Sequence, residues 1–436
     1  MWPYHPELLA VPVPRYTSYP TAADFGELDP HALPRAIEQA TGDISLYVHI
    51  PFCEEICFYC GCNTSRSGKK ARVESYLAAL HDEIETVASL LPQETRVRRI
   101  AFGGGSPNAI LPAQFLHLVE TLERRFAAER PLYSIELDPR TMSAEWAGAI
   151  GTAGITRASM GVQTFSPECQ KAIGRVQDDA MIARSVDWLR DAGVTSLNFD
   201  LMYGLPHQSL GDLADSIEMT RRMGADRIAL FGYAHVPHFV PRQRVIDASA
   251  LPGAATRFTM AREGFAALTG AGYQAIGFDH FALPGDALAI AAREGTLRRN
   301  FQGFTEDPSD ILIGMGASAI SGFPGLIAQN EKNAGRYRML TSQGRLTAGH
   351  GIVRSADDRM RAALIEELLC TGSTTLSPCL LARIERRLAP FIAHDLVTRD
   401  GMKLAISGDG LPYARIIASF LDRYREETTK MFSAAI

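Results

Sequence analysis

The stretch that decides the fold is residues 44–63, ISLYVHIPFCEEICFYCGCN. It places Cys53, Cys57 and Cys60 in a C-x3-C-x2-C pattern, and Cys62 follows two residues later. The residues before the cysteines form a short apolar run rich in β-branched and aromatic side chains, which predicts a buried strand. We therefore expect the cysteines on the loop that leaves the carboxyl end of that strand.

Four of the chain's seven cysteines fall within the ten residues 53–62, and this close spacing suits a metal site. A disulfide here would close a very short loop, and distorted disulfide geometry stores strain. Iron–sulfur clusters are usually held by four cysteine thiolates, so three on one loop would leave one iron open to a small molecule. Two other interpretations remain open. One is a four-cysteine zinc site, although zinc sites prefer two well-separated cysteine pairs, and the other is buried structural thiols.

The composition is that of an ordinary globular chain. It has 436 residues, of which 46% are hydrophobic and 21% charged, and its net charge is −5. The negative charge gives no reason to expect nucleic acid as a partner. No apolar run has transmembrane length, and the first residues lack the pattern of a signal peptide. Clustered cysteines without an export signal predict a cytoplasmic protein that does not insert into a membrane.

An alternation of strands and helices begins at residue 44. The predicted strands cover residues 44–52, 98–105, 133–139, 157–163, 196–204 and 227–234. Helical patterns separate them, for example at 72–91 and 112–129, with apolar residues at helical spacing. This alternation predicts the α/β class, with parallel βαβ units and right-handed crossovers. Six units are too few for a closed eight-stranded barrel, so we expect an open, partial (β/α)6 barrel with its chemistry at the carboxyl ends of the strands.

The pattern divides the chain into three domains. Residues 1–43 are rich in proline and predict an extended N-terminal arm, and residues 44–325 form the partial barrel. Residues 326–436 predict a small, mostly helical, winged-helix-like lid domain. Within it we expect a hairpin that turns at Asp400-Gly401 and a final helix over 411–427. A winged helix does not by itself imply DNA binding.

The cysteine pattern after a strand resembles the signature of the radical S-adenosylmethionine (SAM) enzymes. The longer string at residues 47–63 is similar to one branch of them, the oxygen-independent coproporphyrinogen III oxidases. The resemblance runs from about Pro14 to the C-terminus. It includes PRYTSYPTA (14–22), ELDPR (136–140), MGVQ (160–163), NFDLMYGLPHQ (198–208), FGYAHVP (231–237), DHFALP (279–284) and RNFQGF (299–304).

This resemblance implies an activity. It implies a [4Fe–4S] cluster held by Cys53, Cys57 and Cys60, with SAM at the open iron. A 5′-deoxyadenosyl radical made from SAM would oxidatively decarboxylate two propionates of coproporphyrinogen III to vinyl groups, giving protoporphyrinogen IX. The electron donor is not identified by the sequence, and we expect a monomer. Cys62 would remain free beside the cluster, as a candidate catalytic thiol.

The resemblance also implies two bound SAM molecules and assigns residues to them. The chemistry of two of these residues supports the assignment, because Asp200 suits ribose hydroxyls and Arg175 suits a carboxylate. Each of the polar residues, taken alone, would more often be a surface or capping group. The full set is Tyr47, Tyr59, Gly104, Gly105, Ser106, Glu136, Gln163, Arg175, Asp200, Ala234 and Ile320.

The chain departs from the family pattern at several positions. Ser106 and Asn108 replace residues that are commonly threonine, Thr164 replaces a carboxylate, and Arg298 stands where histidine is common. Two alternative functions remain open. One is a haem-binding chaperone of the same superfamily, which Cys62 and the PRYTSYPT arm argue against. The other is a divergent paralogue with altered activity.

Overall fold

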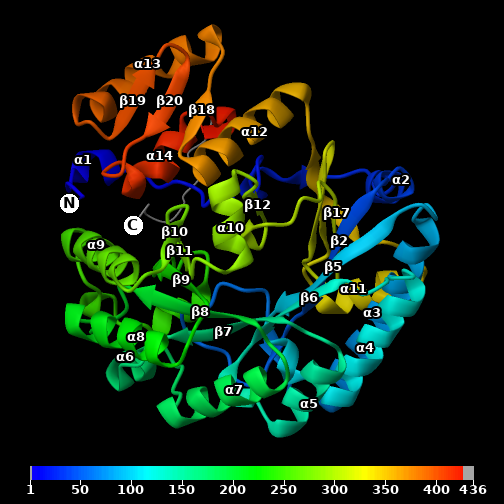
Figure 1. Ribbon diagram of the computed structural model, residues 1–436. Helices are drawn as coiled ribbons and strands as arrows, with labels where there is room; N and C mark the ends of the chain where they lie inside the picture. The colour runs from blue at the N-terminus through cyan, green and yellow to red at the C-terminus, as the bar shows by residue number, and fades with distance from the viewer. Residues whose placement is uncertain (1, 426–436) are drawn as a thin grey trace.

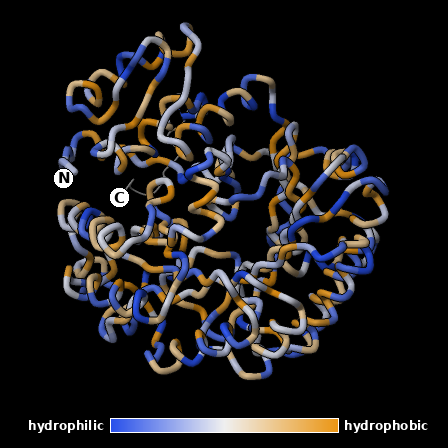
Figure 2. Tube along the Cα trace, viewed as in Figure 1, coloured by the Kyte–Doolittle hydropathy of each residue, from blue (hydrophilic) through white to orange (hydrophobic). Residues whose placement is uncertain are grey.

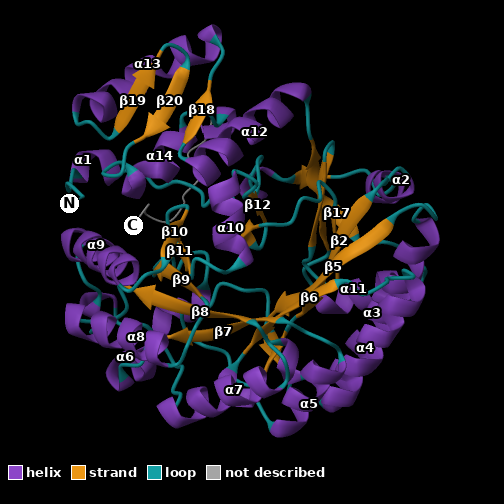
Figure 3. Cartoon of the chain, in the orientation of Figure 1, coloured by secondary structure: helices purple, strands orange, loops and turns teal. Residues whose placement is uncertain are grey.

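The computed structural model describes residues 2–425. Its centre is a curved sheet in which six parallel strands follow one another in chain order (Figure 3). Each of the six lies where the sequence predicts a strand, within about two residues. They are β2 (Asp43–Ile50), β5 (Arg96–Gly104), β6 (Leu132–Leu137), β7 (Arg157–Gln163), β8 (Ser196–Tyr203) and β9 (Arg227–Gly232).

Helices cover the outer face of this sheet and connect successive strands (Figure 1). They are α3 (Lys70–Leu90), α4 (Pro112–Arg125), α5 (Ala144–Thr152), α6 (Pro167–Ala172), α7 (Asp179–Asp191) and α8 (Leu210–Arg222). Local sequence fixes where several of them begin. Ser209 and Asp212 form a capping box that satisfies free backbone N–H groups at the start of α8. These helices carry both hydrophobic and hydrophilic residues (Figure 2), as expected of helices with one face on a core.

The sheet is larger than the sequence predicts, with 13 strands among the described residues. Beside β2, β14 (Leu312–Met315) adds a seventh parallel strand. Short antiparallel strands then extend both edges. On the β14 side these are β15 (Ile320–Phe323), β16 (Leu326–Asn330), β17 (Ala348–Val353) and β1 (Gly26–Glu27), and on the β9 side β11 (His280–Ala282) and β10 (Gln274–Ile276).

The predicted division into three domains stays a prediction, but the strand pairing bears on its second boundary. The boundary at 325/326 falls in the turn between β15 and β16, which pair antiparallel in the large sheet. A second hydrophobic core draws most of its residues from the chain after β17, starting with the helix that follows it. This pairing favours a later boundary, near Val353.

The C-terminal region packs around that second core. Its elements are α12 (Ala356–Thr371), β18 (Ser373–Thr375), α13 (Pro378–Ala393), β19 (Val397–Asp400), β20 (Lys403–Ile406) and α14 (Ala414–Ser419). The predicted hairpin is present, and Gly401 in its turn has a φ of 57°. The predicted final helix is shorter than expected, since only α14 is α-helical, and residues 426 and 427 lie outside the described part.

The N-terminal arm crosses from the barrel to the C-terminal region. Val13, Tyr16 and Tyr19 are buried in the C-terminal core, and the Tyr16 hydroxyl donates to Asp422 at 3.0 Å. The arm's first helix, α1 (Pro6–Leu9), lies beside the C-terminal elements in Figure 1. No helix of residues 2–425 has both the length and the apolar character needed to cross a membrane.

Candidate active site

The cysteine loop leaves the carboxyl end of β2, as the sequence predicts. Its base is closed by a small ladder between β3 (Phe52–Cys53) and β4 (Ser65–Arg66). The Cys53 carbonyl accepts a hydrogen bond from the Ser67 backbone N–H at 2.9 Å, which fixes both ends of the loop. All four cysteines of the loop are free thiols and line one cavity at the barrel mouth, namely Cys53, Cys57, Cys60 and Cys62.

Two arginines and one aspartate surround Cys57. Arg175 Nη1 lies 3.3 Å and Arg140 Nη2 3.4 Å from the Cys57 sulfur. Asp138 pairs with both guanidinium groups, at 3.1 Å to Arg175 Nη2 and 2.7 Å to Arg140 Nη2. Asp138 therefore holds both guanidinium groups in place beside the Cys57 sulfur.

The neighbouring thiols differ in acidity because their surroundings differ. Hydrogen bonds from the Cys62 side chain and backbone lower the pKa of Cys60 to about 6. Burial raises the pKa of Cys53 to about 11, although Thr64 Oγ1 lies 3.2 Å from its sulfur. A metal must therefore displace a proton from Cys53 when it binds, whereas Cys60 is already prone to ionise at neutral pH.

A glycine turn ends β5 and faces the cysteine loop. Gly104 has a φ of 118°, which side chains rarely adopt, and a Cβ there would lie 2.7 Å from the His49 ring. A Cβ on Gly105 would lie 2.5 Å from the Phe52 carbonyl oxygen. Glycine is therefore required for the close approach of this turn to the cysteine loop, and it leaves backbone open to the cavity.

Two carboxylates reach into the same cavity from neighbouring strands. Glu136 accepts a hydrogen bond from the Gly104 backbone N–H at 3.1 Å. Enclosure within the barrel raises the pKa of Glu136 to about 7, and the charge of Asp200 adds to this effect. Asp200 accepts hydrogen bonds from Asn198 at 2.8 Å and Ser159 at 3.2 Å, and burial raises its pKa as well. Because the Glu136 and Asp200 carboxylates both line the cavity, each can accept a hydrogen bond from a bound hydroxyl or amino group.

Comparison with known proteins places this site in a family. Residues 47–220 match the model of the Radical SAM superfamily. The oxygen-independent coproporphyrinogen III oxidase of Bradyrhizobium diazoefficiens is 39% identical, with 97% of each chain covered. The corresponding protein of Paracoccus denitrificans is 41% identical over 94% of each. The chain belongs to the oxygen-independent coproporphyrinogen III oxidase family.

Solved structures agree with this assignment. The coproporphyrinogen III oxidase HemN of Escherichia coli, a radical SAM enzyme, superimposes with a TM-score of 0.90 at 35% identity. The match covers 97% of this chain and 99% of that one. The predicted radical SAM fold and family are therefore confirmed, and the family implies a [4Fe–4S] cluster and SAM. Three thiols on one loop beside a glycine turn are a donor set and a cradle that fit these groups.

Most residues that the resemblance assigned to this oxidase site line the cavity. They are Tyr59, Gly104, Gly105, Glu136, Gln163, Arg175 and Asp200, together with the four cysteines. Gln163 is held with a φ of 70° at an irregularity in the β7–β8 pairing. Such a bulge re-aims a side chain, and backbone strain of this kind is typical of functional sites.

Four assigned residues lie elsewhere. Tyr47 sits behind the glycine turn, and its hydroxyl lies 3.2 Å from His49 Nδ1. Ser106 is buried and its hydroxyl donates to Asn108 Oδ1 at 2.6 Å. Ala234 follows β9 and lines a separate chamber, and Ile320 begins β15. Their assignment to SAM stays a prediction.

The assignment of Arg175 to a SAM carboxylate also stays a prediction, and in the structure its guanidinium contacts protein groups. Its Nε and Nη2 donate to the Gly161 carbonyl oxygen at 3.0 and 2.6 Å. Nη1 is directed at Cys57 and Asp138. The guanidinium is thus engaged by protein groups and braces the cysteine loop against β7.

Sequence reasoning missed Asp138 and Arg140 as site residues, although the motif ELDPR contains both. Asp138 also explains two departures from the family pattern. Asn108 Nδ2 donates to the Asp138 carbonyl at 2.8 Å, and Asn108 Oδ1 accepts from the Asp138 N–H at 3.1 Å. Ser106 and Asn108 therefore form one network that positions Asp138.

The other two departures lie away from the cavity. Thr164 is fully buried and its hydroxyl accepts a hydrogen bond from the Ser166 backbone N–H at 3.1 Å. Arg298 forms ion pairs with Glu366 at 2.8 Å and Asp310 at 2.9 Å, so this additional cation is matched by protein carboxylates.

Proposed function

We propose that this protein converts coproporphyrinogen III to protoporphyrinogen IX without oxygen. Each of two propionates loses carbon dioxide, a hydrogen atom and an electron, and a vinyl group remains. The observation that carries this proposal is the shared cavity of the cysteine loop, the glycine turn and the two carboxylates. Its support from relatives extends over nearly the whole chain. We also propose that the protein acts as a cytoplasmic monomer.

The chain's own residues would divide the work. Cys53, Cys57 and Cys60 would hold the cluster, and the Gly104-Gly105 backbone would receive the methionine end of SAM. When bound, the cluster and SAM supply an electron and a radical that removes hydrogen. Glu136 and Asp200 would orient polar groups of SAM, and the barrel wall would exclude water from the radical. A second SAM molecule is proposed from the resemblance.

Cys62 is proposed as the catalytic thiol. It follows Cys60 by two residues, and its backbone N–H lies 3.4 Å from the Cys60 sulfur. We expect Cys53→Ala, Cys57→Ala and Cys60→Ala each to lose the cluster. Cys62→Ala should keep its iron yet decarboxylate more slowly. If Cys62→Ala loses its iron while Cys60→Ala keeps it, the ligand assignment is wrong, and full activity of Cys62→Ala would remove its proposed role.

The decisive experiment is anaerobic reconstitution with iron and sulfide, followed by product analysis with SAM, a reductant and coproporphyrinogen III. Protoporphyrinogen IX and 5′-deoxyadenosine are the expected products. Stable retention of added haem without turnover would instead favour the haem-binding chaperone. Stoichiometric zinc without iron would favour a zinc site.

A further inference from the structure

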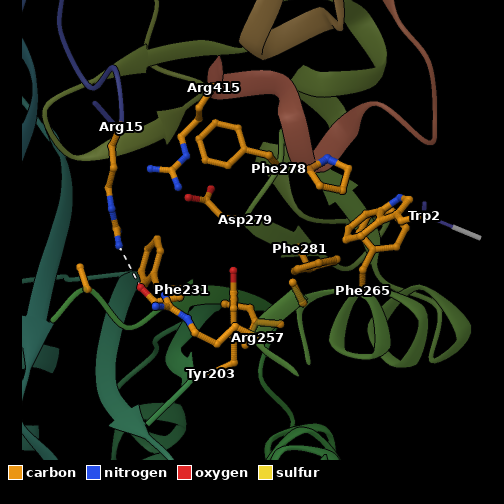
Figure 4. Close-up of a pocket in the computed structure, with 15 residues that line it drawn as sticks. Trp2, Arg15, Tyr203, Phe231, Arg257, Phe265, Phe278, Asp279, Phe281 and Arg415 are labelled. Atoms are coloured by element: carbon orange, nitrogen blue, oxygen red, sulfur yellow. Dashed lines mark hydrogen bonds between the residues drawn. The ribbon is translucent and has the colours of Figure 1, made fainter. Parts of the chain in front are cut away.

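A second chamber lies at the carboxyl ends of β8 and β9, beside the proposed active site. Figure 4 shows its walls. The arm contributes Trp2 and Arg15, and the C-terminal region contributes Arg415. The barrel supplies the remaining wall, including Tyr203 and Phe231. The chamber therefore exists only where all three parts of the chain meet.

Cations outnumber carboxylates in this chamber. Arg15, Arg257 and Arg415 line it, whereas Asp279 is the one acidic residue in its lining. Asp279 is already engaged, because its Oδ1 lies 2.7 Å from Nδ1 of the neighbouring His280. Arginine stays charged in proteins, so an enclosed excess of guanidinium groups favours binding of an anion.

Arg257 gives the clearest evidence of an unused hydrogen-bond donor in this chamber. It lies on α9 (Ala254–Gly270), and its Nη2 donates to the Tyr233 carbonyl at 2.7 Å. Its Nε is buried without a hydrogen-bond partner. Within residues 2–425 neither Arg257 nor Arg15 forms an ion pair with a carboxylate. A buried N–H of a charged group is costly to leave unpaired, which points to a ligand that supplies the missing acceptor.

The arginines at the base of the barrel provide a contrast. Arg99 and Arg157 also point into a cavity, but both pair with Glu306, Arg99 at 2.6 Å. Their positive charges are paired with a carboxylate of the protein, as expected of residues with a structural role. By contrast, Arg257 and Arg15 of the chamber have no carboxylate partner within residues 2–425.

The other walls of the chamber are aromatic. The Trp2 and Phe265 rings lie 4.6 Å apart, and those of Phe265 and Phe281 lie 5.7 Å apart. Arg15 lies over the Phe231 ring at 5.0 Å, and Phe231 also lines the barrel cavity that reaches Glu136 and Asp200. A flat, carboxylate-bearing ring system would meet both the stacking faces and the cations here.

We propose that this chamber binds a propionate-bearing pyrrole edge of the tetrapyrrole, with Arg257 and Arg415 as the carboxylate-binding cations. The proposal rests on the proposed function and names the substrate-binding residues for it. Coproporphyrinogen III carries four propionates, of which two are kept. The chamber holds a retained propionate away from the radical, and the propionate that reacts extends through the barrel mouth toward the cysteine loop.

Binding of coproporphyrin III, the fluorescent oxidised form of the substrate, tests this assignment. We expect Arg257→Gln and Arg415→Gln each to weaken its binding about tenfold, the loss typical of one charge-assisted hydrogen bond. In turnover the KM for coproporphyrinogen III should rise more than kcat falls. Arg257→Lys keeps the charge and should bind with intermediate affinity. Arg262→Gln is the matched control on α9, because Arg262 pairs with Glu263 at 2.9 Å.

A second ligand separates a binding role from a structural one. Mesoporphyrin IX has two propionates, so wild-type protein should prefer coproporphyrin III and the glutamine variants should lose much of that preference. Iron content and the unfolding midpoint show whether each variant is folded. Unchanged affinity in both glutamine variants, or an equal loss in Arg262→Gln, would overturn the inference. Wild-type protein that neither binds nor converts the tetrapyrrole would instead overturn the proposed function.

Discussion

At the scale of single residues, the site depends on buried ion pairs between one carboxylate and two guanidinium groups. Asp138 is 6% exposed and joins Arg140 and Arg175, which both reach the Cys57 sulfur. Such a cluster is stable only while every charge has its partner, because an isolated buried charge loses its hydration without compensation. The cysteine loop is thereby held in position before any metal binds.

We predict that Asp138→Ala will strongly destabilise the metal-free protein. It leaves the buried Arg175 without a carboxylate and Arg140 with only the exposed Glu55, which should lower the free energy of unfolding by about 3–5 kcal/mol. Urea unfolding measures this change. Asp43→Ala is the control, since Asp43 forms only exposed pairs with Arg96 and Arg98, and its loss should cost less than about 1 kcal/mol. Equal effects of the two variants would contradict the role of Asp138.

His49 makes the stability of the metal-free protein depend on pH. It lies on β2 behind the glycine turn, where burial lowers its pKa to about 4. Between pH 4 and the ordinary value of about 6.5, the unfolded chain binds a proton that the folded chain does not. Stability is therefore complete above about pH 6.5 and is lost as the pH falls toward 4.

We therefore predict that His49→Gln will reduce this pH dependence. Relative to the variant, the wild-type protein should lose about 3 kcal/mol of unfolding free energy between pH 7 and pH 4. Urea unfolding at both pH values gives the difference. His31→Gln changes an exposed histidine and serves as the control. A constant difference between wild type and His49→Gln at both pH values would rule out the proposed titration.

At the scale of elements, the sequence predicts what local patterns encode. The six central strands are apolar runs bounded by turn residues, and their crossover helices have clear periodicity, so both were predictable. The edge strands β10 and β11 have three residues each, too short for a periodic signal. The orientation of Gln163 comes from the irregular β7–β8 pairing, and the role of Asp138 comes from contacts with residues far along the chain. No local sequence pattern predicts the orientation of Gln163 or the role of Asp138.

Helix α3 anchors the edge of the barrel through one buried carboxylate. Glu83 is 2% exposed and accepts hydrogen bonds from the Gly316 N–H at 2.6 Å, Asn330 at 2.7 Å and Tyr337 at 2.6 Å. These donors belong to the turn after β14, to β16 and to α11 (Ala334–Thr341). One side chain thus ties three later elements to the helix that follows the cysteine loop.

We predict that Glu83→Ala will lower the free energy of unfolding by about 3 kcal/mol or more, because three buried donors lose their acceptor. Hydrogen exchange should show the loss of protection concentrated in β14–β16 and α11. Glu85→Ala lies on the same helix in a half-exposed pair with Arg125 and should change stability by less than about 1 kcal/mol. Uniform loss of protection across the whole sheet would argue against this local anchoring role.

At the scale of the whole molecule, the arm joins the barrel to the C-terminal region. Val13, Tyr16 and Tyr19 complete the C-terminal core, while Trp2 and Arg15 line the chamber beside the barrel mouth. The same segment therefore stabilises one domain and shapes a cavity of the other. This arrangement predicts that loss of the arm will weaken the C-terminal region first.

We predict that deleting residues 2–19 will split thermal unfolding of the metal-free protein into two transitions. The C-terminal core loses three buried side chains, each contributing about 1.5–3 kcal/mol, whereas the core beneath the barrel sheet contains none of the deleted residues. Calorimetry should show an early transition for the C-terminal region and a later one for the barrel. Val11→Ala is the control, because Val11 is 51% exposed and should leave the profile unchanged. A single transition at the wild-type temperature would mean that the C-terminal core does not depend on the arm.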